Sequence, residues 1–216
     1  MLDCGSGAVA ALLATDPAAV DAIVLSHVHF DHVADLIPFG YALKLGAIAS
    51  WPTPALYVPP GASERLGALC KAGGARSDHL ARRFDLHEYD PRAELAIGGA
   101  RIAFCELPHP GTCRALRVES GGGVLVYSGD TGVTDRLAPF AAGADLLVCE
   151  ATMGAEPGDA IHLGGGDAGR IATAAGVGRL LVCHVADTHR AAAVGAARAR
   201  FAGPVEAARG GLRATT

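Results

Sequence analysis

Aromatic residues, C-x-x-C pairs and long apolar runs are what this sequence lacks. Aromatic residues make up only 5% of 216 positions, although 50% are hydrophobic. A core must therefore be built mainly from Ala, Val, Leu and Ile in thin, closely packed layers. No apolar run approaches the length of a membrane span, and no signal peptide precedes the first expected strand. Both absences argue against a membrane protein.

Cysteine usage and charge narrow the class further. The six cysteines form no C-x-x-C pair, and several lie in apolar, strand-like segments where cysteine acts as a small hydrophobe. This usage favours a reduced, cytoplasmic protein. The net charge of −4 gives no global attraction to nucleic acid, although a local basic patch stays open. The length fits one domain, residues 1–216, better than two.

What the sequence does contain is a dense cluster of potential metal ligands early in the chain. Four such residues fall within six positions: His27, His29, Asp31 and His32. The short apolar run 22–25 before them predicts a strand, and the residues after them predict a helix. The cluster therefore sits in a strand-to-helix loop, where sites collect in α/β folds.

The spacing inside this cluster suggests how it is used. In extended backbone His27 and His29 project to the same side, so both can bind one ion. Asp31 and His32 follow where the chain turns into the helix, and can address a second ion. The alternative is a hydrogen-bonded surface turn that happens to be rich in histidine, and the ligand density favours the metal interpretation.

The rest of the chain alternates strand and helix patterns. We expect strands at 22–26, 56–58, the second half of 82–89, 95–97, 101–106, 115–119, 124–127, 146–149, 180–183 and 204–206. We expect helices at 12–21 (interrupted by Pro17), 33–45, 63–72, 167–175 and 187–200. Glycines at 98–99 and 121–123 predict two hairpin turns. This order predicts two sheets covered on the outside by helices.

Three further polar residues stand where apolar strands end: His109, Asp130 and His184. Taken singly, each has a plain alternative, because strand-end His and Asp residues often cap turns. Their shared placement favours a common site. With the first cluster they supply five His and two Asp, enough for two metal ions. This nitrogen and oxygen set suits Zn²⁺, with Mn²⁺ or Fe also open.

These motifs together resemble the metallo-β-lactamase superfamily. They are H-x-H-x-D-H at 27–32, a later His, Gly129-Asp130-Thr131, the run 145–152, and His162-Leu163-Gly164 leading to His184. The nearer resemblance is to the ribonuclease Z-like branch and its small phosphodiesterase relatives. It implies an α/β, four-layer αββα sandwich, in which two mixed sheets are flanked by helices. Asp130 replaces the Cys ligand of some lactamases, so antibiotic hydrolysis is not expected.

The resemblance also implies a ligand assignment and a reaction. One ion would be held by His27, His29 and His109, the other by Asp31, His32 and His184, with Asp130 bridging. The reaction is attack of an activated water on a phosphodiester. His162 resembles the additional histidine that contacts the scissile phosphate and protonates the leaving oxygen. We predict that His162 and Asp31 are the catalytic residues. The alternative for His162 is a loop histidine whose ring contacts a backbone carbonyl.

Three other positions suggest roles that support the candidate site. Glu150 either orients His162 or a ligand, or binds backbone amides. Asp3 matches the Asp-x-Gly turn of the branch, a structural support for the metal loop. Gly164–Gly166 opens a helix and could receive an anion, although most glycine-rich turns do not.

Two departures from the branch affect the substrate and the domain boundaries that we expect. Ribonuclease Z carries a long tRNA-holding arm between the residues matching His109 and Asp130, whereas here the interval is 130 − 109 = 21 residues. We therefore expect a small phosphodiester, such as a cyclic nucleotide, rather than RNA. Members of the branch also have two strands before the position of Leu2, so we expect either an N-terminally truncated domain or a wrongly assigned start. That leaves homodimer formation open.

Alternatives to a small-molecule phosphodiesterase remain. The branch resemblance allows tRNA 3′ processing, the same metal centre allows thioester or lactone hydrolysis, and the missing strands allow an inactive metal-binding remnant. Of the other histidines, His79 and His87 are expected at the surface, and His189 in a capping or solvated position. The Arg-rich run 76–83 is expected to be a solvated helix face or a modest phosphate-steering patch.

Overall fold

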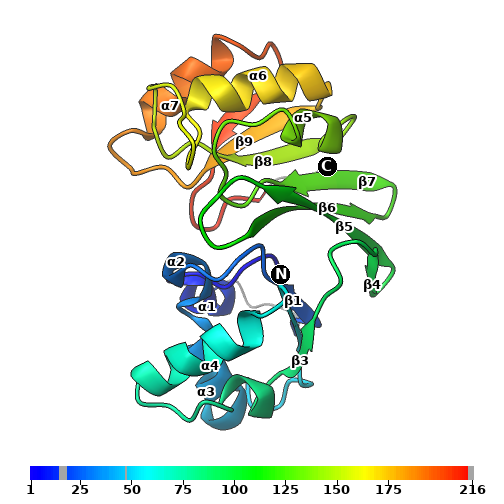
Figure 1. Ribbon diagram of the computed structural model, residues 1–216, viewed down its shortest axis with the longest axis vertical. Coiled ribbons are helices and arrows are strands. Elements are labelled where there is room, and N and C mark those ends of the chain that lie inside the picture. The colour runs from blue at the N-terminus through cyan, green and yellow to red at the C-terminus, as the bar shows by residue number, and fades with distance from the viewer. Residues whose placement is uncertain (15–18, 47, 214–216) are drawn as a thin grey trace. The chain divides into compact units, whose positions relative to one another are not determined.

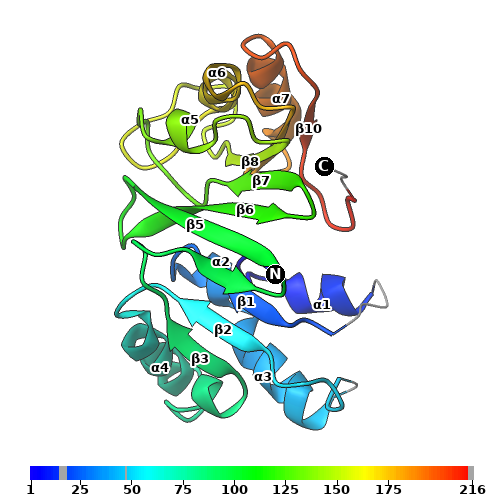
Figure 2. The same cartoon turned by 90° about the vertical axis from the view of Figure 1, so that its right-hand side faces the viewer.

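The computed structural model describes residues 1–14, 19–46 and 48–213. They divide into two compact units, Met1–Asp90 and Pro91–Thr216, each with its own sheet and hydrophobic core (Figures 1 and 2). That residues 1–216 act as one domain stays a prediction. Among the described residues, no helix has the length and apolar character needed to cross a membrane.

The first unit contains a parallel sheet of order β1-β2-β3. Its strands are β1 (Ala22–Val24), β2 (Ala55–Val58) and β3 (Asp85–Glu88). Leu2 adds a parallel bridge to Val24 at the β1 edge. Leu56 and Val58 alternate inward along β2, which is the period-2 pattern of a sheet with one face on a core.

The described residues of this unit also form four helices and a short 3₁₀ turn. They are α1 (Ala8–Leu13), α2 (Phe30–Val33), α3 (Leu36–Leu45), α4 (Ala62–Ala72) and η1 (Leu80–Arg82). Figure 2 shows α3 and α4 beside the sheet, where Phe39 and Leu66 join its core. The unit thus buries the apolar face of the sheet under helices, of which α4 is amphipathic and α3 is apolar on most of its surface.

Three expectations for this unit need correction. The helix expected at 33–45 is divided into α2 and α3, because the Asp35 amide donates to the carbonyl of Cys4 at 3.1 Å instead of continuing a helix. The helix expected at 12–21 covers only the end of α1; residues 19–21 are not helical, and 15–18 lie outside the described residues. His79 is buried, not at the surface, and its Nε2 lies 3.1 Å from the carbonyl oxygen of Ile37.

The second unit contains a seven-stranded mixed sheet of order β10-β9-β8-β7-β6-β5-β4. Its strands are β4 (Leu95–Ile97), β5 (Ala100–Leu107), β6 (Cys113–Ser120), β7 (Gly123–Tyr127), β8 (Leu146–Glu150), β9 (Arg179–Cys183) and β10 (Val205–Ala207). Strands β4 to β7 pair antiparallel, and β7 to β10 pair parallel.

The two predicted hairpin turns are confirmed. Gly98 and Gly99 join β4 to β5, and Gly121 and Gly122 join β6 to β7. All four have positive φ, between 54° and 87°. Two successive positive φ values define the type I′ turn, which favours glycine because it has no Cβ.

Three helices pack against this sheet: α5 (Leu137–Phe140), α6 (Gly165–Ala175) and α7 (Arg190–Arg198). Figure 1 shows α6 lying beside β8 and β9, where Ala168 and Ile171 enter the core. The expected α/β class of two sheets with helices against them is confirmed. The second sheet is mixed as expected, whereas the three strands of the first are all parallel.

Close packing of α6 on α7 depends on glycine. A Cβ on Gly169 would lie 2.4 Å from the carbonyl oxygen of Ala197, whereas one on Gly166 would meet nothing within 4 Å. We expect Gly169→Ala to lower the free energy of unfolding by about 1–3 kcal/mol, the usual cost of overpacking. The matched variant Gly166→Ala should cost nothing. Urea denaturation of both variants checks this, and equal stability would contradict it.

Candidate metal centre

The first-unit ligand group, His27, His29, Asp31 and His32, follows β1 directly. Leu25 still pairs with β2, through its amide and the carbonyl of Tyr57 at 2.9 Å, and the chain then leaves the sheet. The ring of His27 lies 4.6 Å from that of His29 and 4.2 Å from that of His32, between centroids. The four residues therefore gather at the carboxyl end of a strand, as their spacing predicted.

Asp3 stabilises this loop through hydrogen bonds. Its carboxylate accepts hydrogen bonds from the amide of Ser26 at 2.7 Å, the hydroxyl of Ser26 at 2.8 Å and Nδ1 of His32 at 2.7 Å. An ionised carboxylate only accepts, so Nδ1 of His32 carries the hydrogen. The structural role expected for Asp3 is thus visible in its contacts, and Nε2 of His32 keeps a lone pair for a metal.

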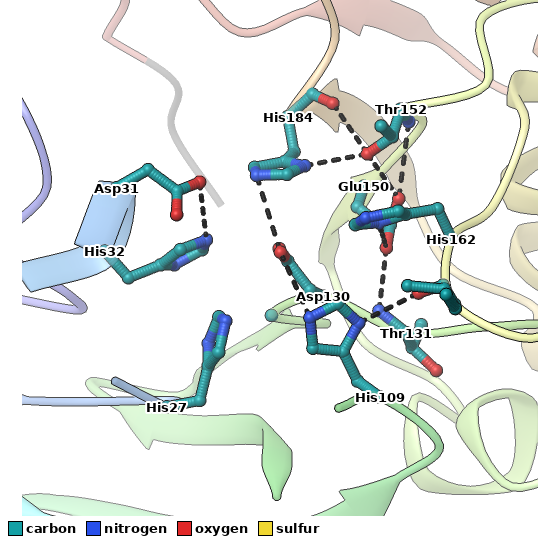
Figure 3. Close-up of polar contacts among 12 residues, drawn as sticks. His27, Asp31, His32, His109, Asp130, Thr131, Glu150, Thr152, His162 and His184 are labelled. Carbon is teal, nitrogen blue, oxygen red and sulfur yellow. Dashed lines mark hydrogen bonds and ion pairs between the residues drawn. The ribbon is translucent and has the colours of Figure 1, made fainter. Parts of the chain in front are cut away.

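The second-unit ligand group consists of His109, Asp130 and His184. Figure 3 shows Asp130 between the two histidines. Its Oδ2 lies 3.7 Å from Nε2 of His109 and 3.4 Å from Nε2 of His184. Two ligand atoms about 2.1 Å from a tetrahedral ion are separated by about 3.4 Å. These three strand-end residues are therefore brought together at a spacing that fits ligation.

His109 is held by a loop that also carries His162. Its Nδ1 donates to the carbonyl oxygen of Ile161 at 2.9 Å. A carbonyl only accepts, so Nε2 of His109 keeps its lone pair on the side of Asp130. In metal sites, a histidine that binds the ion through one ring nitrogen usually donates a hydrogen bond from the other nitrogen to the protein. His32 and His109 both donate such a hydrogen bond from Nδ1.

Glu150 ends β8 fully buried, and it does both things considered for it. Its carboxylate accepts hydrogen bonds from the amides of Thr131, Thr152 and Leu163. It also lies 3.0 Å from Nδ1 of His162, whose ring stacks on His184 with centroids 5.6 Å apart. Nδ1 of His162 therefore contacts a carboxylate, where the alternative expected a backbone carbonyl; the catalytic role of His162 stays a prediction.

The helix opening at Gly164–Gly166 has its leading amides occupied. The amide of Gly164 donates to the carboxylate of Asp167 at 3.0 Å, and that of Gly165 to the carbonyl of Gly154 at 2.8 Å. Asp167 sits at the third position of α6, and its carboxylate reaches back to the amide of the N-cap residue Gly164, while the Asp167 amide donates to the backbone carbonyl of Gly164. The protein's own carboxylate thus takes the place considered for an external anion.

Other histidines lie as follows. His87 is exposed, as expected, and pairs with Asp85 at 2.9 Å. His189 is exposed at the residue preceding α7, in agreement with a solvated position. In the Arg-rich run, Arg76 and Arg82 both bind Asp78, so part of its positive charge is neutralised within the run.

The cysteines behave as the composition indicated. All six are free thiols. Burial, with help from the nearby carboxylates of Asp35 and Asp3, raises the pKa of Cys4 to about 12. Burial likewise raises the pKa of Cys149. Both thiols therefore stay protonated and act as small hydrophobes.

Three supporting residues escaped the sequence analysis: Ser26, Thr152 and Asp159. Ser26 lies beside His27, and Thr152 contacts His184 at 2.7 Å. Asp159 accepts hydrogen bonds from the amides of Ile161 and His162 at 2.7 and 2.8 Å, an Asx turn that shapes the histidine loop. An Asp three residues before a candidate histidine was the available signal for this turn.

These amide donors, first that of His162 and then that of Ile161, lower the pKa of Asp159. A lowered pKa means that the turn is stabilised above the ordinary Asp pKa, and that this stabilisation is lost as pH falls through the lowered value. In an NMR titration we expect the His162 and Ile161 amide shifts to move together with the Asp159 carboxyl, below pH 3.8. In Asp159→Asn the two amides should not titrate there; movement in that variant would contradict the assignment.

Taken together, strand-end histidines and carboxylates on a two-sheet α/β fold define a metal-dependent hydrolase class. The pattern described as "Beta-lactamase superfamily domain" matches residues 1–185, and the chain belongs to this family. It is similar to the probable metallo-hydrolase YhfI of Bacillus subtilis, with 33% identity over 192 residues covering 86% of this chain and 74% of that protein.

Three further similarities extend this placement. The crystal structure of the metallo-β-lactamase fold protein YhfI from Bacillus subtilis superposes with a TM-score of 0.83 at 31% identity, covering 98% of this chain and 84% of that one. Ribonuclease Z of Mycobacterium bovis is 32% identical over 162 residues, 68% of this chain and 58% of that protein. A diphosphatase from the PhnP family shares the fold, with a TM-score of 0.76 at 20% identity and coverage of 98% and 77%.

Proposed function

We propose that this protein is a dinuclear phosphodiesterase that cleaves a small phosphodiester such as a cyclic nucleotide. The proposal assigns both ligand groups to one pair of divalent ions, with Zn²⁺ the expected metal and Mn²⁺ or Fe as alternatives. His27, His29 and His109 would hold one ion, and Asp31, His32 and His184 the other, with Asp130 bridging. Family membership and the donor chemistry of each group support this assignment.

When bound, such a pair of ions supplies Lewis acidity and lowers the pKa of water toward neutrality. The protein's own contribution to catalysis is the placement of a proton donor. Glu150 accepts from Nδ1 of His162 and thereby fixes the ring, so that the doubly protonated imidazolium can give its Nε2 proton to the leaving oxygen and remain hydrogen-bonded to Glu150. The ring lies 5.1 Å from that of His109, between centroids, beside the second-unit ligand group.

The pair of His162 and Glu150 is the observation that carries the phosphodiester assignment. An alkoxide leaving group needs a proton, and this histidine is held next to two ligand histidines by a buried carboxylate. A thioester releases a thiolate, which has less need of such a group, and we therefore place thioesters second. A lactone also releases an alkoxide, so the substrate panel described below separates lactones from phosphodiesters.

Cleavage of precursor tRNA is the alternative favoured by a specific observation, the 32% identity to ribonuclease Z of Mycobacterium bovis. The interval between His109 and Asp130 argues against it. Strands β6 and β7 and their two-residue turn fill most of this interval, as predicted. We propose that the binding partner is a small molecule. A homodimer stays open, and light scattering measures the number of subunits.

The test is a substrate panel on purified protein with measured metal content. We expect hydrolysis of bis(p-nitrophenyl) phosphate and of a cyclic nucleotide with Zn²⁺ or Mn²⁺, and none after chelation. We also expect Asp31→Ala to abolish turnover, while His87→Ala, at an exposed residue of β3, leaves it unchanged.

The same panel separates the alternatives. Cleavage of precursor tRNA in preference to small diesters would favour RNA processing, and turnover confined to a thioester or lactone would favour the other hydrolase class. Full metal loading with no turnover would indicate an inactive remnant. Phosphodiester hydrolysis that survives chelation or the Asp31 substitution would reject the proposal.

A further inference from the structure

Thr152 links the buried carboxylate of Glu150 to a ligand histidine. Its hydroxyl oxygen lies 2.8 Å from Oε2 of Glu150, 2.7 Å from Nδ1 of His184 and 3.0 Å from the carbonyl oxygen of His184 (Figure 3). Glu150 therefore reaches two histidines, His162 directly and His184 through a hydroxyl.

The direction of these hydrogen bonds follows from the number of hydrogens. A hydroxyl has one hydrogen to donate, and two of the three neighbours of Thr152 are oxygens that only accept. If that hydrogen pointed at Nδ1 of His184, the Glu150 carboxylate would face a lone pair at 2.8 Å. Donation to the charged carboxylate is stronger. The hydroxyl thus donates to Glu150, and Nδ1 of His184 must donate to the hydroxyl.

We propose that Thr152 is a positioning residue that fixes His184 in the tautomer with its hydrogen on Nδ1. In this tautomer the Nε2 lone pair faces Asp130, whose Oδ2 is 3.4 Å away, and is available to a metal ion. In the other tautomer Nε2 would carry a hydrogen and could not ligate. The metal part of this inference rests on the proposed function; the tautomer part does not.

Thr152 also contacts the backbone of His184, which has an unusual conformation. His184 has φ of +51°, a left-handed conformation that non-glycine residues adopt rarely. Its carbonyl oxygen and its ring are both within 3.0 Å of the same hydroxyl. One side chain thus contacts both parts of a residue whose conformation is intrinsically disfavoured, as strained functional positions require.

The same arrangement recurs in the first unit. The hydroxyl of Ser26 lies 2.8 Å from Oδ2 of Asp3 and 3.0 Å from Nδ1 of His27. Asp3 also contacts His32 directly, at 2.7 Å. By the same hydrogen count, Ser26 donates to Asp3 and accepts from His27. A buried carboxylate therefore orients one histidine directly and one through a hydroxyl in each unit.

The experiment compares Thr152→Val, which removes the hydroxyl at nearly constant volume, with Thr152→Ser, which keeps it. Thr173→Val is the matched control, because its hydroxyl donates to the carbonyl of Arg200 and contacts no histidine. The readouts are the long-range ¹H–¹⁵N spectrum of histidine rings in metal-free protein at pH 8.5, and Zn²⁺ affinity by competition with a chromophoric chelator.

We expect His184 to be the Nδ1–H tautomer in the native protein, in Thr152→Ser and in Thr173→Val. In Thr152→Val we expect this preference to be lost and Zn²⁺ affinity to fall about 10- to 100-fold, the usual loss for a residue that orients a metal ligand. Thr152→Ser should retain affinity. Ser26→Ala should shift the tautomer of His27 but leave that of His184.

Two outcomes would overturn the inference: an Nε2–H tautomer for His184 in the native protein, or an unchanged tautomer and affinity in Thr152→Val. The first outcome is decisive even if Thr152→Val does not fold. The proposed function fails separately. Absence of divalent-metal binding or of metal-dependent phosphodiester hydrolysis in the native protein would reject that function, while the metal-free spectrum still decides the role of Thr152.

Discussion

Replacing Asp130 with alanine is expected to lower phosphodiester hydrolysis at least about thousandfold and to reduce the bound metal. Its Oδ2 is the carboxylate oxygen that lies between Nε2 of His109 and Nε2 of His184, at 3.7 and 3.4 Å. Without it the second-unit ligand group has two imidazoles and no carboxylate. A bound metal contributes several kcal/mol to catalysis, and each 1.36 kcal/mol is about tenfold in rate.

Metal per chain after dialysis, by mass spectrometry, and initial rates on bis(p-nitrophenyl) phosphate measure this effect. Asp130→Asn keeps the size of the side chain and removes its charge, so we expect it to be nearly as damaging. Asp85→Ala is the control, because the side chain of this aspartate of β3 is 68% exposed and pairs with the exposed His87. If Asp130→Ala kept its full metal content and a rate within about tenfold of native, Asp130 would not be a ligand.

Replacing Glu150 with alanine is expected to destabilise the second unit strongly even without metal. The carboxylate is fully buried and accepts from three amides, the Thr152 hydroxyl and Nδ1 of His162. Removing it leaves these donors without an acceptor, at about 1–3 kcal/mol for a buried group. We expect a total loss of about 3 kcal/mol, which lowers Tm by roughly 6–12 °C in a chain of this size.

Thermal unfolding of metal-free protein by circular dichroism checks this loss. Glu150→Gln should be intermediate, because its amide keeps one acceptor oxygen but turns a donor toward the remaining partners. Glu206→Ala is the matched control, an exposed strand glutamate of β10 in the same unit. A Tm for Glu150→Ala within about 2 °C of native would contradict the assigned role.

The clustering of the residues in each candidate ligand group could be predicted because its signal is local; that they ligate a metal stays a prediction. His27, His29, Asp31 and His32 are neighbours in the chain, and the apolar run before them predicts the strand that carries them. Each residue of the second-unit ligand group also follows a strand-like segment, and strand ends are where α/β proteins place sites. That the two groups share one pair of ions stays a proposal.

Errors in the secondary structure came from competing long-range contacts. The pattern at 33–45 is helical throughout, yet the chain breaks at Asp35 because its amide donates to Cys4, far away in sequence. His79 has a polar surrounding sequence that suggests the surface. Its burial depends on the carbonyl of Ile37 and the ring of Tyr41, which only the folded unit brings near.

The sequence by itself determined the class of fold, the hairpin turns and the candidate ligands, because strand periodicity, paired glycines and dense histidines are properties of adjacent residues. Only the tertiary structure decided which side chains orient the candidate ligand histidines. Ser26, Thr152 and Asp159 are ordinary polar residues in the chain. Their roles arise from the direction of single hydrogen bonds, which depends on where folding places each carboxylate, carbonyl and amide.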